Sequence, residues 1–175
     1  METWRLAPEL VIVGEEIMTT RGELLAAFVK EEIPAGLEPL EAIRRLKAQG
    51  AFISVSHPFD GFRNGHWVEA DLLEIVAHVD AIETFNARCM NTAPNRRAAE
   101  FAQKHNLAGT AGSDAHTALE VGRAGLALED FSDAQGLRRV IGSGREFSRL
   151  SSPLIHLSSR FASTVKKIGL VKRPL

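Results

Sequence analysis

From residue 40 onward, apolar segments of strand length alternate with amphipathic segments of helical length. The expected strands are residues 51–56, 79–85, 108–111 and 122–128, and the expected helices are residues 40–49, 69–78, 96–105 and 134–141. Strands that alternate with helices in this way usually pair in parallel through right-handed crossovers. The pattern therefore predicts an α/β fold with a mostly parallel sheet and outer helices.

Two further strands are expected before the first of these helices. Residues 10–13, Leu-Val-Ile-Val, are apolar and uncharged, so residues 9–17 are predicted to form a buried strand. Residues 23–29 contain Glu, Leu and Ala, which also favour helix. Their short length and the preceding turn nevertheless favour a strand that pairs with the first one.

The first of these strands, residues 9–17, needs a partner that covers its exposed edge. An uncharged apolar strand is a poor sheet edge, because nothing discourages it from pairing with another chain. Residues 9–17 could be covered by the C-terminal segment or by a second copy of the chain, or they could cause aggregation. We expect a homodimer, since symmetric dimers are the commonest soluble assembly.

The composition indicates one soluble globular domain. The chain has 175 residues, of which 45% are hydrophobic and 25% charged, and its net charge of −1 provides no basic field for nucleic acid. Cys89 is the only cysteine, so no internal disulfide can form and a reducing, cytoplasmic location is expected. No apolar run approaches the roughly 20 residues that cross a membrane, and residues 1–5 show no signal-peptide pattern.

The last part of the chain differs in composition from the rest. Residues 148–175 are rich in Ser, Lys and Arg, and their apolar residues recur at spacings of three and four from Leu154 to Ile168. This spacing predicts an amphipathic helix that packs on the preceding domain, with a membrane-surface or partner-binding helix as the alternative. We therefore divide the chain into an α/β domain, residues 1–147, and a basic C-terminal segment, residues 148–175.

Residue types that bind metals follow three of the expected strands. Glu16 ends the first strand, His57 follows residues 51–56, and Asp114 and His116 follow residues 108–111. Asp114 and His116 are two residues apart, so on a strand they would share a face. Each residue alone has an ordinary structural explanation, such as a solvated acid or a turn histidine. Together, at the strand edge that carries active sites in α/β folds, they predict a metal site.

Six short motifs also occur in a fixed order between residues 10 and 128. They are Gly14-Glu15-Glu16-Ile17, Gly22-Glu23, Ser56-His57-Pro58-Phe59-Asp60, Arg63, Ile82-Glu83-Thr84-Phe85-Asn86-Ala87-Arg88 and Gly112-Ser113-Asp114-Ala115-His116-Thr117. As a set they resemble the PHP superfamily, the polymerase and histidinol phosphatase domain. The resemblance implies a distorted, TIM-like (β/α)7 barrel whose C-terminal edge holds two or three metal ions. It also implies hydrolysis of small phosphorylated substrates by metal-activated water.

The resemblance also implies roles for individual residues. By position, Glu16 corresponds to the bridging carboxylate, and the other metal ligands are His57, Asp114 and His116, which would hold Mn, Zn, Fe or Mg. Arg63 and Arg88 stand where substrate phosphate would be bound. The family usually has a histidine ligand after the fourth strand, whereas this chain offers only Asn86 and Cys89 there.

One departure from the family pattern affects the expected activity. The family opens with a strand followed by His-x-His and then a Thr-Asp-His pattern, and neither pattern precedes Glu16. We therefore expect an incomplete PHP-type barrel, the C-terminal three-quarters of it in residues 1–147, with partial metal occupancy and reduced phosphoesterase activity. The alternative is a non-catalytic PHP-like scaffold or interaction module.

Overall fold

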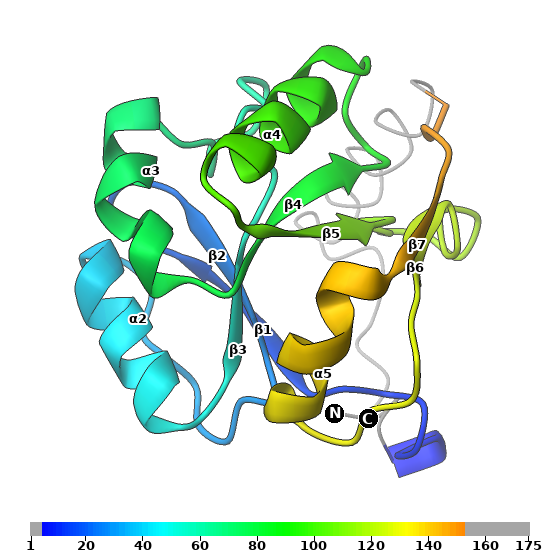
Figure 1. The fold of residues 1–175 in the computed structure, drawn as a ribbon, viewed down its shortest axis with the longest axis horizontal. Coiled ribbons are helices and arrows are strands. Elements are labelled where there is room, and N and C mark those ends of the chain that lie inside the picture. The colour runs from blue at the N-terminus through cyan, green and yellow to red at the C-terminus, as the bar shows by residue number, and fades with distance from the viewer. Residues whose placement is uncertain (1–4, 153–175) are drawn as a thin grey trace, which may run out of the picture.

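The structure, a computed structural model, describes residues 5–152 and contains a curved five-stranded sheet (Figure 1). Its strands, in spatial as well as chain order, are β1 (Gly14–Met18), β2 (Glu23–Ala27), β3 (Phe52–Val55), β4 (Ala81–Asn86) and β5 (Ala108–Gly112). The β3–β4 and β4–β5 pairs are parallel, whereas β1–β2 and β2–β3 are antiparallel. The predicted α/β class is confirmed, but the sheet is mixed. The short turn at residues 19–22 can join only antiparallel neighbours.

The helices cover the sheet unevenly (Figure 1). They are α2 (Pro39–Ala48), α3 (Glu69–Ile75) with its 3-10 extension η1 (Val76–His78), α4 (Ala93–Lys104), and α5 (Ala134–Val140) with its 3-10 extension η2 (Ile141–Ser143). Figure 1 shows α2, α3 and α4 along the outer side of the sheet, with α5 across one end. The main core lies beneath the first three helices, and a smaller one joins α5 to Phe52 and Ala81.

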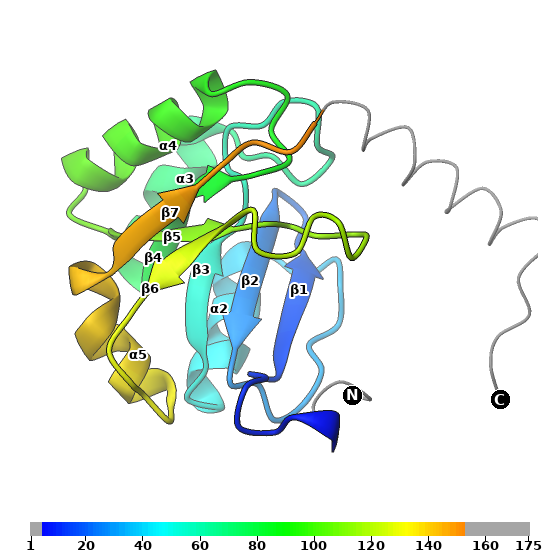
Figure 2. The same ribbon diagram turned by 90° about the vertical axis from the view of Figure 1, so that its right-hand side faces the viewer.

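A two-stranded antiparallel sheet stands beside the main one (Figure 2). It consists of β6 (Ala124–Ala127) and β7 (Arg145–Ser148), and β6 lies next to β5 without joining its hydrogen-bonded ladder. The sequence did not reveal β7, because all four of its residues are exposed and give no alternating apolar pattern. Within residues 5–152 the strands form no closed barrel, so the barrel expectation is replaced by a mixed sheet plus a hairpin.

The prediction that residues 10–13 form a buried strand is wrong. Strand β1 begins only at Gly14, and Leu10 and Ile12 are 80% and 42% exposed. Gly14 pairs with Ala27, the last residue of β2, so the preceding residues have no strand left to pair with. Phe28 then adopts a φ of 64°, which turns the chain away from the sheet.

Strand β1 is an edge of the described sheet, and this bears on assembly. We predict a homodimer that covers this edge and the exposed Leu10 and Ile12. Light scattering coupled to size exclusion at tens of micromolar should give twice the chain mass of 19.1 kDa. A well-folded monomer at that concentration would contradict the prediction.

Two further expectations concern the C-terminal segment and membrane-spanning helices. The predicted amphipathic helix at residues 154–168 lies outside the described residues, and so does most of the segment 148–175. Among residues 5–152, no helix has the length and apolar character needed to cross a membrane.

Candidate metal centre

Three side chains converge where β1 and β3 end and β2 begins. Glu16, Glu23 and His57 each offer one ligand atom, and these atoms lie within 4.8 Å of one another. The His57 Nε2 atom lies 3.1 Å from Glu23 Oε1. Glu23 and His57 are buried, whereas Glu16 is exposed, so the group is open to solvent on one side. Among the described residues, these three side chains form the group of acidic and histidine residues that could hold a metal ion.

The register of the β1–β2 hairpin brings the two carboxylates together. Glu16 pairs with Leu25, and Glu23 lies two residues before Leu25, so both glutamates project from the same face as diagonal neighbours. Trp67 fixes the beginning of β2, because its indole N–H donates to the Glu23 carbonyl at 3.0 Å. A Cβ on Gly22 would lie 2.4 Å from that indole, so this position requires glycine.

His57 is held in an uncommon backbone conformation. Its φ is 23°, which side-chain-bearing residues rarely adopt, and such strain concentrates at functional sites. The His57 backbone N–H donates to Glu83 Oε2 at 2.8 Å. Strand β3 ends at Val55, and His57 with Pro58 directly after it follows that end, so the imidazole is presented at the sheet edge.

The three groups change one another's pKa values. A hydrogen bond with Glu23 raises the pKa of Glu16 to about 8, aided by partial burial and by the negative charges of Glu23 and Asp114. Burial alone would raise the pKa of Glu23, but hydrogen bonds with His57 and Glu16 lower it overall. Burial disfavours protonated His57, yet the hydrogen bond and charge of Glu23 raise its pKa. Because metal ligands must be deprotonated, a bound cation would displace these protons.

Asp114 lies at the same sheet edge but contacts other groups. Its Oδ2 atom accepts hydrogen bonds from the Arg63 guanidinium and, at 3.2 Å, from Asn86 Nδ2. Asn86 Nδ2 also donates to Glu83 Oε2 at 3.1 Å, the atom that accepts from the His57 backbone. Asp114 has a φ of 47°, a second strained residue in this region. The structure thus links Asp114 to the neighbourhood of His57 through shared hydrogen-bond partners.

The other predicted site residues differ in their surroundings. The His116 side chain is 48% exposed, and its Nδ1 atom lies 2.9 Å from the Asp114 carbonyl oxygen. Arg63 is 24% exposed and contacts Asp114, so its guanidinium lies at the site. Arg88 is buried and pairs with Glu120 at 3.1 Å. Of the two predicted phosphate-binding arginines, Arg63 therefore has the more accessible guanidinium.

Asn86 and Cys89 lie at and just after the end of β4, where the family usually has a histidine ligand. Asn86 ends β4 and donates to Asp114, whereas Cys89 is buried and its thiol donates to Asn95 Oδ1 at 3.3 Å. Burial, followed by the negative charges of Asp60 and Glu83, raises the pKa of Cys89 to about 12. A thiol with so high a pKa is a poor thiolate ligand, so Asn86 is the residue here that faces the site.

The sequence analysis placed Glu23 and Glu83 within motifs but gave neither of them a role, and Glu120 was not among its candidates. The search for ligands followed the C-terminal ends of strands, but Glu23 begins the antiparallel strand β2. Glu83 lies inside the largely apolar strand β4 and is buried. The available signal was a carboxylate placed within a strand that is otherwise apolar, because an acid is buried only when it is paired or functional.

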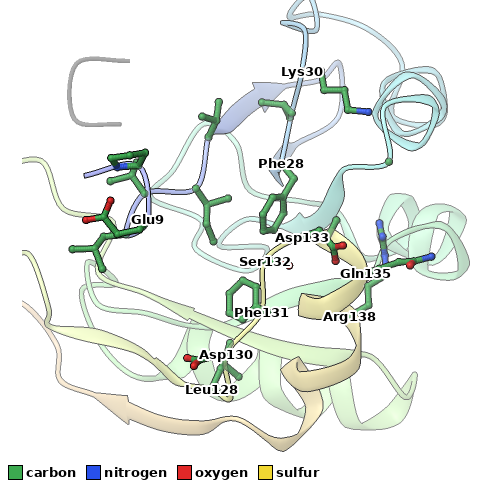
Figure 3. Close-up of a pocket in the computed structure, with 18 of the residues that line it drawn as sticks. Glu9, Phe28, Lys30, Leu128, Asp130, Phe131, Ser132, Asp133, Gln135 and Arg138 are labelled. Atoms are coloured by element: carbon green, nitrogen blue, oxygen red, sulfur yellow. The ribbon is translucent and has the colours of Figure 1, made fainter. Parts of the chain in front are cut away.

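A large open groove lies at the opposite edge of the sheet (Figure 3). It has a volume of about 1180 Å³ and is lined by residues 8–13, by the end of β2 and by the segment leading into α5. Figure 3 shows Phe28 and Phe131 in its wall, with ring centroids 6.3 Å apart in an edge-on arrangement. None of the predicted metal ligands lines this groove, so its size does not make it the reaction site.

The comparisons with known proteins agree with the resemblance found in the sequence. Residues 92–146 match the family described as PHP-associated, PHP_C. The uncharacterized protein MJ0417 of Methanocaldococcus jannaschii is 41% identical over 124 residues, which are 69% of this chain and 52% of that protein. The chain spans about half the length of the curated relatives that it matches.

Two crystal structures share this fold. PsfC from Pseudomonas syringae gives a TM-score of 0.64 at 22% identity, over 86% of this chain and 64% of PsfC. A two-domain protein from Bacteroides vulgatus, described as containing a predicted PHP-like metal-dependent phosphoesterase, gives 0.61 at 19% identity, over 92% and 52%. At these identities the likeness concerns the fold. The match of residues 92–146 shows that this part of the chain is a PHP-associated segment.

Proposed function

We propose that the chain carries a divalent-metal site of a PHP-type phosphoesterase acting on small phosphorylated substrates. The observation that carries this proposal is the convergence of Glu16, Glu23 and His57, whose ligand atoms lie within 4.8 Å of one another. Two further observations support it: Asp114 lies in the same neighbourhood, and the fold is shared with a protein described as containing a predicted PHP-like metal-dependent phosphoesterase.

The donor set fits a first-row divalent cation. Two carboxylates and one imidazole suit Mn²⁺, Fe²⁺ or Zn²⁺, and the carboxylates also suit Mg²⁺. Glu16, Glu23 and His57 would hold one ion, and Asp114 and His116 are the proposed further ligands. We expect one equivalent of metal or less, because the described residues offer one such three-ligand group.

The protein residues have separate parts in the proposed hydrolysis. A bound cation supplies a more acidic water and neutralises phosphoryl oxygens. Glu23 Oε1 and His57 Nε2 lie 3.1 Å apart, so these two side chains would act as neighbouring ligands of that cation. Arg63 presents a guanidinium fork that can bind two phosphate oxygens, and its present partner is the carboxylate of Asp114.

The activity test is Mn²⁺-dependent hydrolysis of p-nitrophenyl phosphate by the purified chain. We expect turnover below the range of about 1–10³ s⁻¹ typical of enzymes, because the described residues offer a single three-ligand group. Arg63→Ala should raise KM for the phosphoester, whereas Arg96→Ala, which removes an exposed arginine on α4, should leave it unchanged. Turnover within the enzyme range that disappears in His57→Ala would overturn the expectation of reduced activity.

A non-catalytic PHP-like module is the alternative. It is favoured by the hydrogen bonds that Glu23 makes with Glu16 and with His57 Nε2, although His57 Nδ1 is buried without a hydrogen-bond partner. Metal analysis of the purified protein separates the two proposals. Bound metal supports the phosphoesterase, and a folded protein that binds none after incubation with Mn²⁺ supports the module.

A further inference from the structure

One fully buried carboxylate lies outside the three-ligand group. Glu120 is 0% exposed and belongs to the loop between β5 and β6 that also carries Asp114 and His116. Its Oε2 atom accepts hydrogen bonds from the His116 backbone N–H at 3.0 Å and from Thr117 Oγ1 at 2.9 Å. Its Oε1 atom lies 3.1 Å from Arg88 Nη1. The carboxylate thus joins this loop to the segment that follows β4.

The same two segments are joined a second time through Asn86. The Arg88 backbone N–H donates to Asn86 Oδ1 at 2.9 Å, and Asn86 Nδ2 donates to Asp114 Oδ2 at 3.2 Å. These contacts form a closed ring that runs from Asp114 through Asn86, Arg88 and Glu120 to His116. Both proposed ligands of this loop are therefore tied to the end of β4.

This ring of contacts fixes the geometry of the residues that it connects. Burial of an ion pair seldom stabilises a fold more than apolar side chains of similar volume would. A buried pair does fix geometry, and geometry is demanding here, because Asp114 is held at a φ of 47°. Such a conformation persists only where the surrounding contacts determine it.

We propose that Glu120 is a positioning residue that sets the placement of Asp114 and His116 for metal binding. The proposal rests on the proposed function, since it takes these two residues as ligands. Glu120 holds the His116 backbone, and Asn86 holds the Asp114 carboxylate at the other side of the ring. The contact of His116 Nδ1 with the Asp114 carbonyl leaves Nε2 as the ring nitrogen available to a cation.

The test compares Co²⁺ binding, monitored by visible absorption, in the wild-type protein and in three variants. Glu120→Ala removes all three contacts of the carboxylate. It should weaken binding by about 10–100-fold and change the spectrum, as the loss of a residue behind the metal ligands commonly does. Glu120→Gln keeps an oxygen that can accept from the His116 N–H, so it should recover part of the loss. Glu129→Gln, at an exposed position, should bind like wild type.

Hydrogen exchange of the His116 amide shows separately whether the ring exists. Exchange should accelerate in Glu120→Ala and much less in Glu120→Gln. Should Glu120→Ala fail to fold, Glu120→Gln and Thr117→Val, which removes one donor to Glu120, give the same comparison with smaller changes. Accelerated exchange with unchanged Co²⁺ affinity and spectrum would overturn the positioning role alone. A wild-type protein that binds no metal would overturn the proposed function itself.

Discussion

Replacement of His57 by alanine is expected to weaken Mn²⁺ binding by more than the roughly 10–100-fold that changes in outer ligands cause. His57 supplies the nitrogen of the three ligand atoms that lie within 4.8 Å of one another. Its loss would leave two carboxylates, of which Glu16 has its pKa raised to about 8 by the hydrogen bond to Glu23. Calorimetric titration with MnCl₂ measures the change, with circular dichroism to verify folding.

Two further variants are measured in the same way as His57→Ala. His78→Ala removes an exposed histidine at the end of η1 and should bind Mn²⁺ as wild type does. Glu23→Gln keeps the size of the side chain but removes one anionic ligand, so it should also weaken binding. Unchanged affinity in both His57→Ala and Glu23→Gln would place the metal elsewhere and would contradict the assignment of this centre.

Replacement of Glu83 by glutamine is expected to stabilise the metal-free protein at pH 8 by on the order of 3 kcal/mol. Burial raises the pKa of Glu83 to about 7 in the folded protein, although hydrogen bonds from Asn86 and the His57 backbone oppose the shift. The unfolded chain has the ordinary value of 4.5, so between about pH 4.5 and 7 the folded state binds more protons. The stability of the wild type should therefore fall as the pH rises through this range.

Glutamine resembles the protonated acid and removes this pH dependence. Its amide oxygen can still accept from the His57 N–H and Asn86 Nδ2, which both donate to Glu83 Oε2. Urea unfolding with a chelator at pH 4.5, 6 and 8 should show a difference that grows with pH. Glu100→Gln, which changes an exposed glutamate on α4, is the matched control. A difference between Glu83→Gln and wild type that is independent of pH would contradict the prediction.

Much of the fold could be predicted because its elements carry local patterns. The amphipathic spacing of residues 40–49 and 96–105 predicted helices that the structure has as α2 and α4. The apolar runs at 51–56 and 79–85 became β3 and β4. Strand β7 carries no such pattern, since its residues are all exposed, and its existence depends on pairing with β6.

The predicted site shows the same division between local and long-range information. The residue types and strand ends of Glu16 and His57 pointed to a metal site, and the structure places both in the three-ligand group. The motif containing Asp114 and His116 indicated a second set of ligands. What it could not indicate is the buried ring through Asn86, Arg88 and Glu120, whose members lie in segments far apart in sequence.

The sequence by itself determined most of the helices and strands and offered Glu16 and His57 as candidate ligands, because these depend on side-chain chemistry and on short periodicities. Only the tertiary structure decided that β2 also pairs antiparallel with β3 and so brings its first residue, Glu23, to the edge where β3 delivers His57. It also decided that Arg88 pairs with Glu120 inside the protein. The β2–β3 pairing and the buried ion pair depend on contacts between distant segments, and no local pattern in the chain encodes them.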